Sequence, residues 1–186
     1  RPSRTAARAG SAIGFIFTFV HGGLTGLFLG NVTVDLPLSD TYFVVGHFHM
    51  VMGVSPILVV FGAIYHWYPK ITGRMWNEKL GKAHFWLSTI GVNVLFFPQH
   101  FLGLAGMPRR IPDYSTQFAD WNMVSSIGAF GFGLSQLLFV YIIIKCARGG
   151  AKASDHVWEG AYNHGLEWTV PSPAPYHTFE DAPVVK

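Results

Sequence analysis

Four long stretches of this chain contain no Asp, Glu, Lys or Arg, and they constrain its fold more than any other feature. The stretches are Ser11–Thr33, Thr41–Pro69, Ala83–Pro108 and Trp121–Ile144. A helix that spans a bilayer needs about 20 mostly apolar residues, so each stretch is long enough for one. Charged residues make up only 12% of the chain, whereas they usually make up about a quarter of a soluble domain. The sequence therefore predicts an all-α integral membrane protein with four transmembrane helices.

We expect three regions along the chain. Residues 1–10 form a basic segment, residues 11–148 form the four-helix transmembrane region, and residues 149–186 form a polar, proline-rich tail. The spans are expected approximately over residues 11–31, 41–68, 83–106 and 121–146. We expect the tail to be irregular and to rest on neighbouring subunits.

The basic residues predict the topology. They gather before the first span, between the second and third spans, and after the fourth: Arg1, Arg4, Arg8; Lys70, Arg74, Lys79, Lys82; Lys145, Arg148, Lys152. Four spans place these three regions on one side of the membrane. The positive-inside rule assigns that side, with both termini, to the cytoplasm or to the mitochondrial matrix.

The charge balance and the cysteine count exclude two classes of function. The net charge of +3 comes from the basic connections, so we expect no binding of nucleic acid. Cys146 is the single cysteine. It excludes an internal disulfide and any cysteine-based zinc or iron–sulfur site within one chain.

His47 and His49 lie inside the second uncharged stretch, where an ionisable side chain usually has a functional reason. Two residues along an α-helix correspond to about 200° of rotation. The two imidazoles therefore leave opposite faces of one helix and cannot share a single metal, but each can hold a different one. The spacing predicts a helix between two metal centres, with one axial ligand on either side.

The adjacent pair Arg109-Arg110 breaks the charge bias on the other side of the membrane. One interpretation is two solvated arginines neutralised by Asp113 and Asp120. The other is an anion clamp, because guanidinium groups form bidentate contacts with carboxylates. The two histidines lie toward the same side as this pair. A haem requires both features, since its iron binds imidazole and its propionates attract cations.

Two stretches resemble the signatures of subunit I of the haem–copper terminal oxidases. They are residues 40–49 (DTYFVVGHFH) and residues 96–110 (FFPQHFLGLAGMPRR). The end of the chain, from residues 166–173 (LEWTVPSP) through 177–179 (HTF), resembles the C-terminal tail of bacterial and some mitochondrial cytochrome c oxidases. The resemblance covers nearly the whole chain from Gly14 onward.

The resemblance implies a role for each matching position. His47 would be the catalytic residue, as the iron ligand of a high-spin haem (haem a3) where oxygen binds opposite copper. His49 would be an axial ligand of the low-spin haem (haem a), with Phe48 between the two haems. The remaining positions would surround the haems: Arg109 and Arg110 at the propionates, Asp35 close to a propionate of the high-spin haem, Tyr42 near the low-spin haem, and Asp40 at a magnesium ion.

Three positions depart from the family pattern. Ser39 stands where the family usually has a second magnesium ligand, a histidine, so the magnesium site would keep an extra water or be empty. Gly46 replaces the more usual alanine and would leave room against a macrocycle. His21 also departs from the pattern, and we expect it to be packed or to face a cavity rather than to bind a metal.

The family's subunit I is a twelve-helix bundle, and this chain resembles its last four helices. The copper ligands and the second axial ligand of the low-spin haem belong to the other helices, so the chain alone cannot close the oxygen-reducing site. We expect either a split subunit, completed by a separate chain, or a fragment of a longer product. Residues 1–11, rich in Arg, Ala and Ser, are typical of organellar targeting sequences and fit a bacterial inside anchor equally well.

The implied function is that of the C-terminal portion of a proton-pumping cytochrome c oxidase, which passes electrons from cytochrome c through the low-spin haem to a haem–copper centre that reduces O2 to water. Expected partners are the N-terminal helices of subunit I, oxidase subunits II and III, cytochrome c and the lipid bilayer. The membrane would be the bacterial plasma membrane or the mitochondrial inner membrane. Two alternatives remain open: a quinol oxidase or nitric oxide reductase of the same fold, and a membrane protein whose histidines bind no metal.

Overall fold

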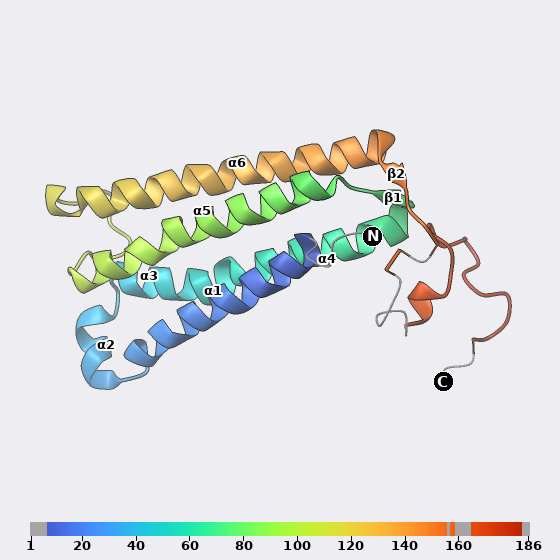
Figure 1. The fold of residues 1–186 in the computed structure, drawn as a ribbon. Coiled ribbons are helices and arrows are strands. Elements are labelled where there is room, and N and C mark those ends of the chain that lie inside the picture. Colours follow the sequence, from blue (N-terminus) through green and yellow to red (C-terminus); the bar gives the residue numbers. More distant parts are fainter. Residues whose placement is uncertain (1–6, 156, 159–164, 184–186) are drawn as a thin grey trace.

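The computed structural model describes residues 7–155, 157–158 and 165–183, and its main feature is a set of four long helical spans (Figure 1). The spans are α1 (Ala7–Leu29), a composite second span (Tyr42–Thr72), α5 (Glu78–Leu104) and α6 (Ala119–Gly149), which the short 3₁₀ turn η2 (Thr116–Phe118) precedes. All four are long and apolar enough to cross a membrane. Parts of the expected basic segment (residues 1–6) and of the tail (residues 156, 159–164 and 184–186) lie outside the described residues.

The second span is not one regular α-helix. It consists of α3 (Tyr42–Phe48), a π-helical turn η1 (His49–Gly53) and α4 (Ser55–Thr72). In the turn the backbone N–H of Val54 donates to the carbonyl of His49, five residues earlier, at 2.8 Å. Pro56 explains the change, because proline has no N–H and its ring clashes with the carbonyl four residues before it. The wider turn begins at His49, one of the two candidate ligands.

Side chains and glycines determine where the helices begin and end. The side chain of Thr41 accepts from the backbone N–H of Phe43 at the start of α3, and Asn77 accepts from two backbone N–H groups at the start of α5. Such caps satisfy donors that a helix leaves unpaired at its first turn. Gly73, with φ of +69°, ends α4 in the left-handed conformation that glycine adopts without strain. The connection after α1 contains a short helix, α2 (Val32–Leu38), capped by Asn31.

Helices α5 and α6 pack closely through small and polar side chains. Ser88 and Ser135 hydrogen-bond across the contact at 2.9 Å, and the hydroxyl of Ser125 donates to the carbonyl of Leu95 at 2.6 Å. A Cβ on Gly128 would collide with the backbone of Leu95, so this glycine sets how closely the helices approach. Small interface residues and interhelical hydrogen bonds are typical of helix pairs in membranes.

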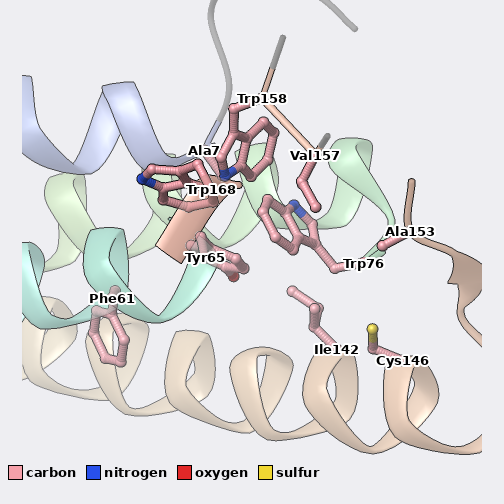
Figure 2. Packing of buried hydrophobic residues seen from close by; sticks show 10 residues of the cluster. All are labelled: Ala7, Phe61, Tyr65, Trp76, Ile142, Cys146, Ala153, Val157, Trp158 and Trp168. Atoms are coloured by element: carbon pink, nitrogen blue, oxygen red, sulfur yellow. The ribbon is translucent and has the colours of Figure 1, made fainter. Parts of the chain in front are cut away.

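The described part of the tail packs against the helices of its own chain and is irregular, as expected, apart from a short strand and one 3₁₀ turn. Its expected contact with neighbouring subunits stays a prediction. Strand β1 (Arg74–Met75) pairs antiparallel with strand β2 (Ala151–Lys152), and a 3₁₀ turn, η3 (Leu166–Trp168), follows. Figure 2 shows tail side chains gathered over the end of the bundle. The buried cluster comprises Ala7, Phe61, Tyr65, Trp76, Ile142, Cys146, Ala153, Val157, Trp158 and Trp168.

The two ends of the bundle carry different elements and connections. The strands β1 and β2 and the described tail lie at the end where α1 and α5 begin and α4 and α6 end (Figure 1). The opposite end carries α2, the start of α3 and the connection between α5 and α6. We call these the basic end and the histidine-side end.

Candidate functional site

His47 lies in the last turn of α3 and faces α1. Its Nδ1 atom lies 2.8 Å from the carbonyl oxygen of Gly22 and 3.2 Å from the hydroxyl oxygen of Thr25. A carbonyl oxygen can only accept a hydrogen bond, so the Nδ1–H of His47 donates to Gly22. The proton on Nδ1 leaves the lone pair of Nε2 available as a ligand.

His49 begins the π-helical turn and faces α5. Its Nδ1 atom lies 2.8 Å from the carbonyl oxygen of Val45, so this nitrogen is also the protonated one and Nε2 is again the free acceptor. The imidazole stacks on Phe96, with ring centroids 4.4 Å apart and planes 8° apart. The ring of Phe48, between the two histidines, lies 4.2 Å from that of His49. The two imidazoles thus leave different faces of the span, as their spacing predicts.

Two glycines provide the space that the imidazoles occupy. A Cβ on Gly26 would lie 2.7 Å from Cε1 of His47, and a Cβ on Gly53 would lie 2.9 Å from Cδ2 of His49. Real Cβ atoms do not approach other atoms so closely, so a side chain at either position would displace the ring. Each imidazole is therefore oriented by a hydrogen bond from Nδ1 to a backbone carbonyl, and it lies in space that is open only because the neighbouring residue is glycine.

Gly46 does not have the expected role. A Cβ at this position would lie 2.9 Å from Cε1 and Nδ1 of His100, so the space is filled by a side chain of α5 and not left for a macrocycle. The ring of His100 also packs edge-on against Phe43 at 5.0 Å. The absence of a side chain at Gly46 lets α3 pack closely on α5.

The imidazole arrangement fits two axial ligands for two haems. A metal-bound histidine usually donates its other ring N–H to a carbonyl or carboxylate, which fixes the tautomer and raises the basicity of the ligating nitrogen. Both rings are half-buried. Across residues 7–155, 157–158 and 165–183, no three His, Cys, Asp or Glu side chains gather to hold a metal ion. A haem, which needs only axial ligands from the protein, suits this donor set better than a metal held by side chains alone.

The histidine-side end joins two segments that are distant in the sequence. The backbone N–H of Arg109 donates to the carbonyl of Asp40 at 2.9 Å, and the N–H of Tyr42 donates to the carbonyl of Met107 at 3.0 Å. The side chain of Arg109 donates from Nε at 2.8 Å and from Nη2 at 2.5 Å to Oδ1 of Asp40. The interpretation that pairs the arginines with Asp113 and Asp120 is wrong for Arg109.

The other candidate residues lie at the same end without forming one cluster. Arg110 is exposed and has φ of +62°, and its side chain has no hydrogen bond or ion pair among the residues that the structure describes. Asp35 lies half-buried in the first turn of α2. Tyr42 packs beside a small buried cluster of Leu102, Met107 and Phe118.

The surroundings of Asp40 do not fit a magnesium site. The carboxylate oxygen Oδ1 already accepts two N–H groups of a guanidinium, and the adjacent Ser39 is exposed and offers only a hydroxyl. Mg²⁺ demands a near-ideal octahedron of oxygen ligands. A guanidinium fixed on one oxygen of this carboxylate opposes a second cation on the other oxygen by charge repulsion.

His21 faces a groove, as expected. The groove has a volume of about 420 Å³ and lies between α1, α5 and α6, lined by Phe17, His21, Asn93, Val94, Phe97, Pro98 and Val124. The Nδ1 atom of His21 lies 3.2 Å from the carbonyl of Phe17 on its own helix.

Sequence reasoning missed the residues that hold the histidines in place. Thr25 and the carbonyl of Gly22 lie 22 and 25 residues before His47, and nothing in the sequence indicates which face of α1 meets that ring. The glycine spacing in residues 22–26 (GGLTG) indicates a close helix contact but not its partner. Pro56 was the available signal for the irregular turn at His49.

Comparison with known proteins gives one consistent result. The family model described as cytochrome c and quinol oxidase polypeptide I matches residues 4–131. The chain is 50% identical over 175 residues to the alternative cytochrome c oxidase subunit 1 of Bradyrhizobium diazoefficiens, covering 89% of this chain and 29% of the relative. It is 46% identical over 172 residues to cytochrome c oxidase subunit 1 of Cereibacter sphaeroides, covering 92% of this chain and 30% of the relative.

The fold has a solved counterpart. A subunit of a haem–copper terminal oxidase dimer superposes with a TM-score of 0.70 at 20% sequence identity, over 80% of this chain and 28% of that one. This chain therefore spans about 30% of the length of the curated relatives and of the solved chain that it matches.

Proposed function

Because this chain belongs to the family of polypeptide I of cytochrome c and quinol oxidases, we propose that it supplies the C-terminal portion of the catalytic subunit of a proton-pumping cytochrome c oxidase. Family membership makes it part of a haem–copper oxidoreductase and a multi-pass membrane protein. The proposal adds the electron donor, the haem types a and a3, and the roles of individual residues. Its partners would be the rest of subunit I, which carries the copper ligands, and subunits II and III.

The observation that carries the proposal is the pair of fixed imidazoles. His47 donates from Nδ1 to α1 and His49 donates from Nδ1 within its own span, so each leaves Nε2 free, on a different face of the span. We propose His47 as the ligand of the high-spin haem and His49 as a ligand of the low-spin haem. When bound, the haems and copper would supply the electron transfer and the oxygen chemistry.

The remaining candidate residues would bind and orient the haems. Arg109 and Arg110 would hold the propionates by charge-assisted hydrogen bonds, and Asp35 would lie close to a propionate of the high-spin haem. Phe48 would fill the space between the two macrocycles. Tyr42, packed at the histidine-side end, would lie near the low-spin haem.

The relatives support cytochrome c as the electron donor. The proteins from Bradyrhizobium diazoefficiens and Cereibacter sphaeroides are both named as cytochrome c oxidase subunits, while the matching family model also covers quinol oxidases. Under the proposed orientation, the basic end would face the cytoplasm or matrix, because Lys and Arg concentrate on that side.

Optical spectra of the purified complex test the proposal. We expect His47→Ala to remove the high-spin haem signal and His49→Ala to remove the low-spin signal, because each loses a different iron ligand. The matched control is His21→Ala, another histidine of the membrane region whose Nδ1 contacts its own helix; both signals should persist. The same preparation should oxidise reduced cytochrome c faster than a quinol. Unchanged haem signals in both ligand variants would refute the assigned roles, and a faster reaction with quinol would refute the donor.

A further inference from the structure

We propose that Asp40 is a positioning residue for Arg109 and that no divalent cation binds at Asp40 in this protein. The first half of the proposal rests on the proposed function, because Arg109 is placed there at a haem propionate. The second half does not, since it follows from the ligands around Asp40 alone.

Asp40 and Arg109 are joined by both side chain and backbone. The guanidinium donates twice to the single oxygen Oδ1, at 2.8 Å and 2.5 Å, and the backbone N–H of Arg109 donates to the carbonyl of Asp40 at 2.9 Å. Thr41 and Pro108 form a β-bridge between the same two segments. Asp40 therefore fixes both the backbone and the side-chain direction of Arg109.

The backbone at this contact is unusual. Asp40 has φ of +60° and Arg110 has φ of +62°, and they are the non-glycine residues with positive φ in the described ranges. Side chains disfavour this left-handed region, although Asp tolerates it better than most residues. Both turns thus adopt a costly conformation at the point where they hold each other, which is typical of functional sites.

The exposure of the pair indicates orientation and not stability as its role. The side chain of Asp40 is 72% exposed and that of Arg109 is 26% exposed. Within this chain alone, solvent screens an ion pair that is open on one side, so the contribution of the pair to the folding of this chain is small. The contact instead keeps the guanidinium of Arg109 at one place beside the helix that carries both histidines.

The same contact excludes a metal ion. A divalent cation on Asp40 would have to bind Oδ2, on a carboxylate whose charge a guanidinium already balances at Oδ1, without an imidazole from position 39. No group of three possible ligands forms around Asp40 within the described part of the chain. Arg109 therefore takes the place that a cation would otherwise have on this carboxylate.

This assignment also separates the roles of the two arginines. Asp40 balances the charge of Arg109, whereas the exposed Arg110 has no ion-pair partner among the described residues. The net positive charge offered to a haem propionate would then come from Arg110, and Arg109 would contribute mainly geometry.

The metal half is tested on the purified oxidase complex from cells grown with Mn²⁺ in excess. Electron paramagnetic resonance after removal of free metal should show the same bound Mn²⁺ in the unmodified complex and in D40N. Asn keeps the shape of Asp and tolerates positive φ, so this variant should fold. One equivalent of Mn²⁺ in the unmodified complex that disappears in D40N would overturn the metal half.

The positioning half is tested by redox titration of the haems. We expect D40N to raise a haem midpoint potential, because the balancing negative charge at Arg109 is lost. The control is D120N, which removes an exposed carboxylate that has no ion pair in the described structure. This control should leave the midpoint potential unchanged. In an R109Q background the D40N shift should shrink. An equal shift in both backgrounds, or no shift at all, would overturn the role. Absence of haem from the complex would instead refute the proposed function and leave the Mn²⁺ result valid.

Discussion

The protons on Nδ1 of His47 and His49 determine what these two side chains can bind. Each proton is donated to a backbone carbonyl, so Nε2 is the nitrogen that each ring leaves free for a metal. Preorganisation of this kind lowers the cost of binding, because the ring loses little freedom when the bond to the metal forms. The hydrogen bond of His47 crosses to α1, and therefore the position of α1 controls the direction of this imidazole.

Gly26 gives a direct test of that control. We expect Gly26→Ala to weaken the bond from His47 to the haem, because the new Cβ would lie 2.7 Å from Cε1 of His47. Turnover should fall by about 10-fold to 100-fold, since a misplacement of about 1 Å at a reacting centre costs on that order. Resonance Raman spectroscopy of the iron–histidine stretch measures the effect. The control is Gly23→Ala, whose Cβ meets nothing within 4 Å; a Gly26→Ala spectrum identical to that of the control would contradict the prediction.

The irregular turn in the second span affects the orientation of a candidate ligand. Pro56 interrupts the α-helical hydrogen bonds and the chain responds with a π-helical turn from His49 to Gly53. Such turns are often found at functional sites, because the extra residue redirects the side chains around them. Here His49 is the first residue of the turn, so the direction of its imidazole depends on a break that the proline imposes.

The pair α5 and α6 provides a prediction about stability. We expect Gly128→Ala to destabilise the complex by about 1–3 kcal/mol, the usual cost of overpacking, because the new Cβ would collide with backbone atoms of Leu95. Loss of haem absorbance during heating measures it. Gly131→Ala should be neutral or slightly stabilising, because nothing lies within 4 Å of its Cβ and alanine favours a helix by up to about 1 kcal/mol over glycine. Equal melting curves for the two variants would exclude Gly128 as the residue that limits helix approach.

At the scale of the whole molecule, the tail connects the ends of several helices. Lys70 of α4 is buried, at 5% exposure, and its ammonium donates to the carbonyls of Val170 and of Asp155. Trp158 donates from Nε1 to the carbonyl of His66 at 3.0 Å, and the guanidinium of Arg8 lies 3.8 Å from its ring centroid. These contacts hold the tail against α1 and α4 at the basic end.

We expect Lys70→Met to release the tail. A hydrogen bond to a charged group contributes about 1.5–3 kcal/mol, so the open fraction should rise by about 10-fold to 100-fold. Limited proteolysis of the complex from the basic end measures this opening as faster cleavage after Gly149. Lys145→Met serves as the control, because the exposed Lys145 contacts Tyr141 of its own helix and not the tail. Equal cleavage rates in the two variants would show that Lys70 does not hold the tail.

The outer faces of the bundle require other molecules. In their most apolar windows α1 and α6 are only 17% buried within the chain, and large apolar side chains such as Leu27 and Phe130 are more than 70% exposed. Lipid or further helices must cover these surfaces, since soluble proteins rarely expose such large apolar patches. This agrees with a chain that spans about 30% of the length of its relatives.

The sequence by itself determined the membrane class, the four spans and the family, because these depend on local composition and on contiguous motifs. It also predicted that His47 and His49 leave different faces, since the geometry of a helix relates neighbours along the chain. The observed contacts with α1 and α5 agree with that prediction.

Only the tertiary structure decided which residues complete each environment. It paired Asp40 with Arg109, 69 residues apart, placed His100 against Gly46, and folded the tail over Trp76 and Tyr65. These contacts join segments that are distant in sequence, and their partners depend on how whole helices rotate and approach. Periodicity along one helix defines its faces, but the neighbour that each face meets follows from packing all the helices together.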